Sequence, residues 1–327
     1  MRLAIFGAGA VGSLIAARLA LAGNDVVVFA RGAHADAMAT AGLILRDAQG
    51  ERRAKVQLAR TAAECGPVSA IIVTTKGHHH CDAVQAIAPL LTGDQPVVFA
   101  VNGIPWWYGI NVRLPGVDPS YDPARRTMDP GGEIGRIVGY RAVGAVIGSP
   151  NTIEAPGIVV NRTERNTLVL GAVDATFAPM LVPLAAVLRD AGIDPGTGAP
   201  IREEIWRKLM YTMCMGPIAC LTGLRNGEIR TDPNLIAILD RLSTEGVALA
   251  RAHGCDPPAR IVIPAVGPIA GHKQSMAQDL ERGRPVEYQP IVGLPRAYAH
   301  AAGVPCPTLD LIAALLEGRL KALDLMY

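Results

Sequence analysis

Lys208 is the residue whose surroundings give the strongest reason to expect chemistry. It precedes a run from Leu209 to Leu221 in which almost every side chain is apolar or small, which predicts a helix buried on all sides. An unpaired ammonium in such surroundings is costly, and its pKa tends to fall. A positioned ammonium can donate a proton or stabilise a developing negative charge. The alternative, which the helix by itself favours, is a lysine that reaches from a core helix to water.

Thr212 and Gly216 extend the same face of the predicted helix. They follow Lys208 at four-residue steps, and residues with this spacing lie one above another on a helix. One cation and two small residues on one face suggest room for a ligand. The sequence therefore predicts a binding site along this face.

Two polar pieces near the end of the chain are candidates to complete such a site. Ser275-Met276-Ala277-Gln278-Asp279 opens or lines a helix, and Arg284-Pro285-Val286-Glu287-Tyr288 begins another. Proline is common at the first position of a helix, so Glu287 is expected in its first turn. A carboxylate there can serve only to favour the helix dipole, and Glu287 taken alone is better explained that way.

A glycine-rich turn near the start of the chain predicts a dinucleotide site. An apolar run, Leu3–Phe6, and a helical pattern, Ser13–Ala22, flank the turn. In this context the three glycines of Gly-x-Gly-x-x-Gly permit a tight turn, close approach of the backbone to a pyrophosphate, and close packing of helix on strand. The helix N-terminus then faces the phosphates. The residues expected to bind the cofactor are Gly7, Ala8, Gly9, Ala10, Val11 and Gly12.

The residue after the second strand selects the cofactor. An NAD site would place a carboxylate there, whereas this chain has Arg31 after the apolar strand Asp25–Phe29. A guanidinium pairs well with a 2′-phosphate, which favours NADP(H), although Arg31 could also be a solvated surface residue. Lys76 follows another apolar strand, Ala70–Thr75, at the sheet edge where ligands bind, and it is a candidate second phosphate contact.

Three consecutive histidines, His78-His79-His80, invite a metal interpretation. Adjacent positions diverge on a helix or a strand, and no cysteine or carboxylate lies at a useful spacing. We expect exposed histidines that open a helix, and no metal site.

Asn102 follows the apolar strand Pro96–Val101 and should project at the same ligand-binding edge. From Ile104 to Arg136 proline, glycine, aspartate and arginine dominate, with Trp106 and Trp107 among them. A long irregular segment in a compact domain is usually a lid or a disordered loop. Because this one leaves the strand directly after Asn102, the sequence favours a partly ordered lid over the active site.

The order of elements predicts an α/β fold with a division near residue 200. Further strands are expected at 43–45, 56–58, 142–147, 158–161 and 167–170, and a helix is expected over 175–191. After 196–200 the alternation stops, and helices are expected over 203–221, 233–253, a stretch ending near 281, 285–302 and 308–323. We predict a Rossmann-type NADP-binding domain at 1–199, with a long insertion at about 104–136, and an all-helical C-terminal substrate and catalytic domain at 200–327.

Composition and charge favour a globular enzyme over a membrane or nucleic-acid-binding protein. The 327 residues are half apolar, and the net charge of +2 gives no argument for nucleic acid or a charged membrane as partner. No uncharged run reaches transmembrane length, and Met1-Arg2 leads directly into a strand rather than a targeting peptide. The six cysteines are scattered without a CxxC pair, as expected for reduced thiols in a cytoplasmic enzyme.

Together these pieces resemble the ketopantoate reductase (2-dehydropantoate 2-reductase) family over nearly the whole chain. The tryptophan–arginine–lysine piece and the serine-to-glutamate piece, in this order behind a Rossmann half, are specific. The matching pieces are Gly-x-Gly-x-x-Gly with Arg31, Thr75-Lys76, Asn102-Gly103, Glu204-Ile205-Trp206-Arg207-Lys208-Leu209, Asn226-Gly227-Glu228-Ile229-Arg230, Ser275-Met276-x-Gln278-Asp279, Gly283-Arg284-Pro285-x-Glu287 and Gly303-Val304-Pro305.

The resemblance implies NADPH-dependent reduction of a 2-oxo acid, by default 2-dehydropantoate to pantoate in pantothenate biosynthesis. It implies that Lys208 is the general acid for the substrate carbonyl, and that Glu287 holds the substrate hydroxyl and takes part in catalysis. It further implies that Ser275 and Asn102 help bind substrate and cofactor, and that two cations, Arg31 and Lys76, meet the NADPH phosphate. Members of the family tend to be monomers or dimers, so a homodimer is one expectation.

Departures from the family pattern fall on the substrate side. Thr212 and Gly216 stand where asparagine is usual, Tyr288-Gln289 replaces isoleucine–aspartate, and the 104–136 segment is longer than the usual connection. Lost polar contacts change which substrate is held, so cofactor and reaction type are better supported than ketopantoate. The alternatives are a reductase of the same fold for a different 2-oxo acid or ketone, and a non-catalytic NADPH-binding protein. Retention of the lysine and the glutamate speaks against the second alternative.

Overall fold

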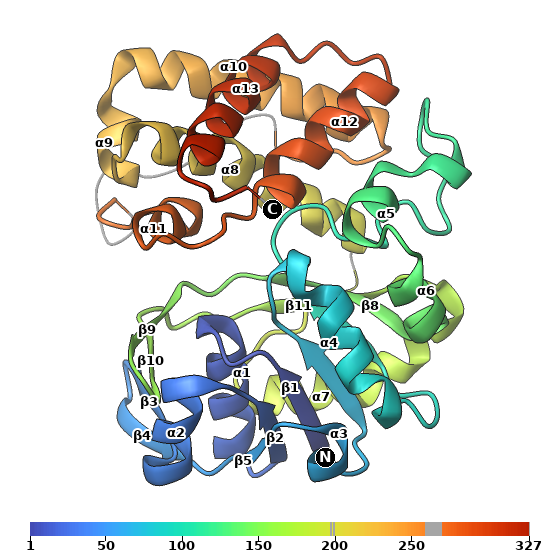
Figure 1. Cartoon of the computed structure of the whole chain (residues 1–327), viewed down its shortest axis with the longest axis vertical. Coiled ribbons are helices and arrows are strands. Elements are labelled where there is room, and N and C mark those ends of the chain that lie inside the picture. The colour runs from blue at the N-terminus through green and yellow to red at the C-terminus, as the bar shows by residue number, and fades with distance from the viewer. Residues whose placement is uncertain (197, 199, 259–269, 327) are drawn as a thin grey trace. The chain divides into compact units, whose positions relative to one another are not determined.

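A computed structural model describes residues 1–196, 198, 200–258 and 270–326. The chain forms two compact units (Figure 1). The first comprises Met1–Val101 and Asp129–Ile201, and the second comprises Asn102–Met128 and Arg202–Tyr327. This division differs from the predicted domains 1–199 and 200–327, because residues 102–128 group with the carboxyl-terminal helices.

The first unit is built on a seven-stranded sheet with the order β11-β8-β7-β6-β1-β2-β5. All neighbours are parallel except β11, which runs antiparallel to β8. Because β1 lies between β2 and β6, the sheet has the Rossmann-like arrangement that the sequence predicts. The strands are β1 Arg2–Phe6, β2 Asp25–Phe29, β5 Gln57–Ala59, β6 Ala70–Val73, β7 Val97–Ala100, β8 Ala142–Ile147 and β11 Leu168–Ala172.

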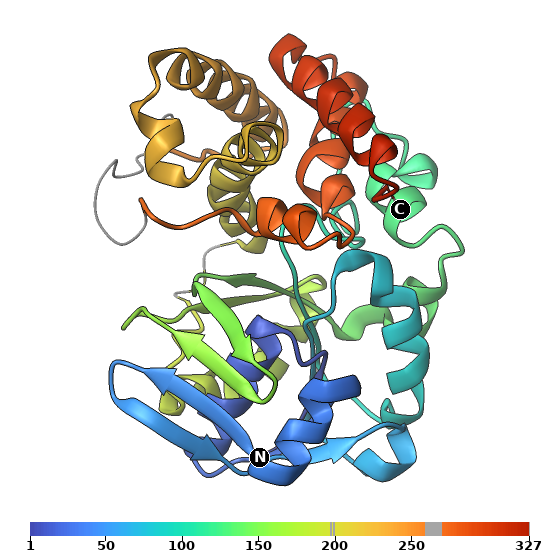
Figure 2. The ribbon, with the colours of Figure 1, turned by 60° about the vertical axis from the view of Figure 1, so that its left-hand side comes forward.

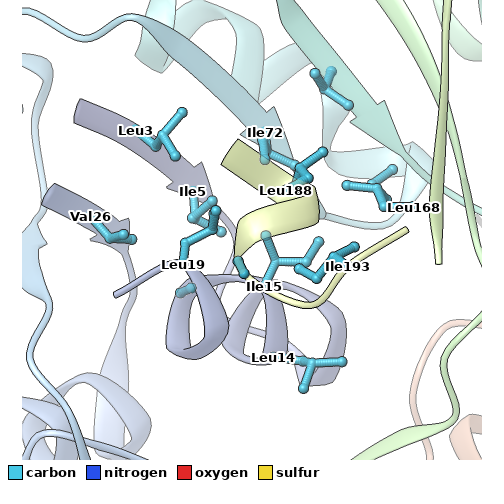
Figure 3. Close-up of a cluster of buried hydrophobic side chains, with 14 of the residues drawn as sticks. Leu3, Ile5, Leu14, Ile15, Leu19, Val26, Ile72, Leu168, Leu188 and Ile193 are labelled. Atoms are coloured by element: carbon cyan, nitrogen blue, oxygen red, sulfur yellow. The ribbon is translucent and has the colours of Figure 1, made fainter. Parts of the chain in front are cut away.

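A second, four-stranded sheet has the order β4-β3-β10-β9. Its strands are β3 Leu43–Asp47, β4 Gly50–Ala54, β9 Asn151–Ala155 and β10 Ile158–Asn161. Helix α1, Ala10–Leu21, contacts strands of both sheets. A helix covered from two sides must be apolar almost all round, which explains the alanine- and leucine-rich sequence of α1. Leu14, Ile15 and Leu19 of α1 enter one core with Leu3 and Ile5 of β1 (Figure 3).

The other helices of the first unit lie around these sheets. The α-helices are α2 Gly32–Ala41, α3 Ala62–Cys65, α4 His80–Ile87, α6 Glu133–Val138 and α7 Leu181–Asp190. The 3-10 helices are η1 Gly77–His79, η2 Ala88–Leu90, η4 Gly139–Arg141 and η5 Ala175–Met180.

The second unit contains helices, turns and loops but no strand among its described residues, in line with the helical domain predicted for 200–327. Its α-helices are α5 Pro123–Met128, α8 Ile201–Thr222, α9 Asn226–Thr231, α10 Pro233–Ala252, α11 Ser275–Glu281, α12 Leu294–Ala301 and α13 Pro307–Ala322. It also contains the 3-10 helix η3 Pro119–Tyr121 and the π-helix η6 Gln289–Gly293. Helices α10, α12 and α13 contact one another (Figures 1 and 2). Gly246 of α10 lets Met210 and Met213 of α8 pack close to its backbone.

One expected helix begins later than the sequence suggests. Pro285 was the predicted start of a helix that holds Glu287 in its first turn, but Glu287 lies ahead of the helical run. That run then opens with the π-helix η6 before it continues as α12. The expectation of Glu287 inside the helix is therefore wrong. π-Helical turns are rare in proteins, and those that occur are often found at functional sites.

Trp106, Trp107 and Tyr108, which the sequence places in a partly ordered lid, are core residues instead. Each is no more than 1% exposed. The Trp206 Nε1 group of α8 donates to the Tyr108 hydroxyl at 2.7 Å, and that hydroxyl is hydrogen-bonded to Nδ1 of His253 at 3.0 Å. Burial lowers the pKa of His253 to about 4, so its ring is neutral and can accept this bond. The segment after Asn102 is thus fastened to the helices of its own unit.

Two further contacts hold the same segment to those helices. Arg202 of α8 donates to the carbonyl oxygens of Tyr108 and Ile110, at 2.9 and 2.6 Å. The Tyr298 hydroxyl of α12 donates to Asp122 at 2.8 Å. Buried polar groups that are satisfied in this way fix one arrangement of the backbone. Among the described residues no helix is both long and apolar enough to span a membrane.

Trp206→Phe should lower the free energy of unfolding by about 1–3 kcal/mol, because it removes a buried donor to Tyr108 and leaves space beside it. Urea unfolding monitored by circular dichroism measures this change. The matched control is Tyr140→Phe, which removes the bond from an exposed hydroxyl to Asp94 and should have a smaller effect. Equal effects of the two substitutions would contradict the anchoring of residues 102–128 through Trp206.

Candidate active site

The glycine-rich turn after β1 has the geometry of a phosphate cradle. Gly7 has a φ of +109°, and a Cβ at Gly12 would overlap the carbonyl oxygen of Gly7. Thr74, directly after β6, donates from its hydroxyl to that carbonyl oxygen at 2.6 Å and holds the turn in place. A Cβ built at Gly9 meets no atom within 4 Å, so the space ahead of α1 is open. The turn therefore fits the pyrophosphate of a dinucleotide at the N-terminus of α1.

Two cations flank this turn along the edge of the sheet. Arg31 follows β2 and is the exposed N-cap residue of α2, and Lys76 follows β6 and is the N-cap residue of η1. Because β2 and β6 pair with opposite sides of β1, the two residues lie on either side of the glycine turn. No carboxylate ends β2, so this edge suits a phosphate better than a ribose diol.

The histidine triplet opens a helix, as the sequence predicts, but it is not uniformly exposed. His79 is exposed, whereas His80 is 0% exposed and packs on Phe99 with ring centroids 5.2 Å apart. Burial lowers the pKa of His80 to about 4, so it is neutral. The expectation of exposure is wrong for His80, because α4 turns its first residue toward the sheet.

A different group of possible metal ligands lies between α12 and α13. Ligand atoms of His300, Cys306 and Asp310 all lie within 4.8 Å of one another. Asp310 also accepts a bond from Arg296 Nε at 2.7 Å, and one of its carboxylate oxygens lies 2.9 Å from His300 Nε2. The adjacent guanidinium opposes a cation, so ion pairing accounts for this cluster.

Lys208 and Glu287 are brought together in the second unit. Lys208 is the eighth residue of α8 and is partly buried. Burial lowers the pKa of its ammonium to about 8, and the Glu287 carboxylate raises it and so opposes part of that shift. Of these two opposing effects on the pKa of Lys208, burial is the larger. An amine with a pKa near neutrality can hold a proton and also release it.

Asn102 and Glu287 are joined by a hydrogen bond. The Asn102 Nδ2 group donates to Glu287 Oε2 at 3.3 Å, and Glu287 is 8% exposed. The backbone holds this pair in register, because the Ile104 amide donates to the Pro290 carbonyl at 2.8 Å. Gly103 has a φ of +77°, and a Cβ there would overlap that same carbonyl oxygen. The backbone after Asn102 therefore packs closely against η6, which begins two residues after Glu287.

The face beyond Lys208 is less open than the sequence suggests. The Thr212 hydroxyl donates to the carbonyl oxygens of Lys208 and Leu209 of its own helix, at 3.4 and 3.3 Å. A Cβ at Gly216 would lie 2.7 Å from the Met276 sulfur, so Met276 of α11 occupies the room expected there. Ser275 is the exposed first residue of α11, next to Met276.

Sequence reasoning missed a polar cluster beside this face. The Tyr211 hydroxyl accepts bonds from Gln274 Nε2 at 2.6 Å and from Asn226 Nδ2 at 3.1 Å. Asn226 was noted only as part of a motif. A tyrosine inside an apolar helical run, three residues after Lys208, was the available signal, because its hydroxyl needs a polar partner when buried.

Comparison with known proteins identifies the family to which the chain is similar. The family model "Ketopantoate reductase PanE/ApbA" matches residues 3–106, and "Ketopantoate reductase PanE/ApbA C terminal" matches residues 200–320. A 2-dehydropantoate 2-reductase of Mesorhizobium japonicum is 34% identical over 97% of each chain. A solved structure from Ralstonia solanacearum, assigned as a ketopantoate reductase, is 30% identical with a TM-score of 0.84 over 99% of each chain.

A further structural relative is D-mandelate dehydrogenase, solved with NADH and anilino(oxo)acetate. It has a TM-score of 0.82 and 20% identity, and the match covers 99% of this chain and 100% of that one. At this identity the likeness is one of fold.

Glu287→Gln should move the pKa of Lys208 below its value of about 8, because the carboxylate that raises this pKa is lost while the burial stays. NMR titration of the lysine Cε resonance measures the midpoint, with Lys208→Arg to assign the signal. The control is Glu281→Gln, which alters an exposed carboxylate paired with Lys273 and should leave the midpoint unchanged. An unchanged midpoint in Glu287→Gln would show that the two groups are not coupled.

Proposed function

Since the chain belongs to the ketopantoate reductase family of oxidoreductases, we propose that it reduces a 2-oxo acid to a 2-hydroxy acid with NADPH. The default substrate is 2-dehydropantoate, which would place the protein in pantothenate biosynthesis. The observation that carries this proposal is the partly buried Lys208, with its pKa lowered to about 8, beside Glu287, which in turn accepts a bond from Asn102.

In this reaction Lys208 acts as the general acid. When bound, NADPH supplies the hydride that adds to the carbonyl carbon of the substrate. As negative charge develops on the carbonyl oxygen, the Lys208 ammonium stabilises it and transfers one proton to it, which gives the alcohol and a neutral amine. Glu287 balances the lysine charge and accepts a bond from the substrate hydroxyl. Asn102 fixes the carboxylate of Glu287, and Ser275, at the exposed start of α11, is assigned to substrate binding.

The cofactor preference follows from the edge of the sheet in the first unit. Backbone amides at Gly7–Gly12 would hold the pyrophosphate, and Arg31 and Lys76 would meet the 2′-phosphate. We assign Asn102, which follows β7, to the cofactor as well as to the substrate. All six cysteines are free thiols, in keeping with the cytoplasmic location that we propose, and a homodimer is part of the same proposal.

A second candidate is a reductase for a different 2-oxo acid. The Thr212 hydroxyl is bonded to carbonyl oxygens of its own helix, and Met276 covers Gly216. Both features favour a substrate whose side chain forms fewer hydrogen bonds than that of ketopantoate, which carries a hydroxyl group. The same fold also holds a D-mandelate dehydrogenase, so the fold by itself leaves the substrate open. NADPH consumption with a panel of 2-oxo acids separates the two candidates and the non-catalytic alternative.

Arg31→Asp should weaken NADPH binding by about tenfold or more, because a carboxylate would repel the 2′-phosphate where a guanidinium attracts it. Fluorescence titration of NADPH and NADH measures both affinities. The matched control is Arg136→Asp on α6, an exposed arginine paired with Glu133, which should bind NADPH as the native protein does. Equal native affinity for the two cofactors would contradict the assignment of Arg31.

Lys208→Ala should lower turnover by about a hundredfold or more, since the proton donor is lost, while NADPH affinity changes little. Steady-state NADPH oxidation with the best 2-oxo acid of the panel measures turnover. Lys321→Ala, on the exposed side of α13, serves as the control and should keep native turnover. Near-native turnover in Lys208→Ala would mean that the proton comes from another group.

A further inference from the structure

Tyr211 lies on the same stretch of α8 as Lys208. The two are three residues apart, a spacing at which side chains on a helix are neighbours about 5–6 Å apart at Cβ. Tyr211 is partly buried. Tyr211 has no role in the proposed proton transfer, yet its hydroxyl has two hydrogen-bond partners.

The hydrogen bonds to Tyr211 all run toward its oxygen. Gln274 Nε2 donates to it at 2.6 Å and Asn226 Nδ2 at 3.1 Å. The orientation of these amides is set by the bond from Gln274 Nε2 to Asn226 Oδ1 at 2.7 Å, because the accepting oxygen of Asn226 turns its Nδ2 toward the tyrosine. Asn226 is 0% and Gln274 5% exposed, so neither has ready access to water. The oxygen of Tyr211 is thus occupied by two donors.

A phenol that accepts two bonds keeps its own proton for donation. Burial raises the pKa of the Tyr211 hydroxyl, and the bonds from Gln274 and Asn226 lower it by a smaller amount, so the group stays protonated at neutral pH. The two amide donors make the hydroxyl a stronger donor, because hydrogen bonds in a chain polarise one another.

The network also ties this hydroxyl to the start of α11, where the candidate substrate residue Ser275 lies. Gln274 is the N-cap residue of α11, and Ser275 is the exposed residue that follows it. The amide of Asn226 donates to the carbonyl of His272 at 3.1 Å, and that of Gly227 donates to the carbonyl of Ala270 at 2.8 Å. These bonds fasten the start of α9 to the chain before α11. The Tyr211 hydroxyl, on the helix that carries Lys208, is therefore held at one position by partners from the starts of α9 and α11.

We propose that Tyr211 is a substrate-binding residue that donates a hydrogen bond to the carboxylate of the 2-oxo acid. Since the substrate is the one named in the proposed function, this inference rests on that function. A 2-oxo acid carries its carboxylate directly on the carbonyl carbon, so a carbonyl held at Lys208 brings the carboxylate within reach of the next turn of the same helix. A carboxylate accepts and never donates, which matches a hydroxyl that has only its proton to offer.

Tyr211→Phe tests this through discrimination between a 2-oxo acid and its methyl ester. The ester keeps the reacting carbonyl but lacks the charged acceptor. For the acid, KM should rise about tenfold with little change in kcat, as expected for loss of one bond to a charged group, equivalent to about 1.4 kcal/mol. For the ester, both constants should stay near their native values. The preference for acid over ester should therefore fall by about tenfold.

Tyr140→Phe is the matched control, because it removes an exposed hydroxyl from the first unit and should preserve the native preference. Gln274→Met, which removes one amide donor but keeps the hydroxyl, should reduce the preference by a smaller factor. Thermal unfolding of each variant reports on folding.

Three results would overturn the inference. The native preference for the acid in Tyr211→Phe, or an equal loss of turnover on acid and ester, would assign Tyr211 a structural role only, and both leave the proposed function intact. A native protein that reduces no 2-oxo acid with NADPH would instead overturn the proposed function, and this inference with it.

Discussion

The structure of the helical unit depends on keeping one ammonium group partly out of water. Burial disfavours the charged form of Lys208 and lowers its pKa. The neighbouring Glu287 carboxylate raises that pKa by a smaller amount, so the pKa of Lys208 is about 8. A carboxylate that is only 8% exposed must in turn be hydrogen-bonded, and Asn102 supplies the bond. Glu287 thus compensates part of the cost of burying the Lys208 charge, and Asn102 compensates part of the cost of burying the Glu287 charge.

That constraint explains why residues far apart in sequence share this unit. Asn102 leaves strand β7 of the sheet unit and joins η6 through the amide of Ile104 and the close approach of Gly103. The segment that follows is then fixed by Arg202 and Trp206 of α8, the helix that also carries Lys208. The register of Asn102 against Glu287 is therefore set by the core, so a buried tryptophan can matter to a site that it does not touch.

Sequence patterns predicted the parts whose structure is dictated locally. The glycine turn, the buried strands and the long apolar helix α8 follow from backbone sterics and periodicity. Most of residues 102–128 fall in the segment that the sequence favours as a partly ordered lid. Their packing in the core was missed because their irregular backbone is stabilised by side chains such as Tyr108, whose partners lie about a hundred residues away. The start of the helical run after Glu287, and not at Pro285, was missed because a proline indicates a helix start without fixing its residue. Tyr211 was not recognised as a candidate site residue because it stands in an apolar run. Its hydrogen-bond partners come from α9 and the start of α11, which the sequence alone does not place beside it.

The pH dependence of the reaction in both directions tests the central role of Lys208 most directly. Reduction needs the protonated amine, so kcat/KM for the 2-oxo acid should fall as pH rises through about 8, whereas oxidation of the 2-hydroxy acid needs the neutral amine and should rise through the same pH. Measurement of both profiles between about pH 6 and 10 spans this range. Opposite limbs with a common midpoint near pH 8 are the predicted result. Two profiles without a limb in this range would contradict a proton transfer through Lys208.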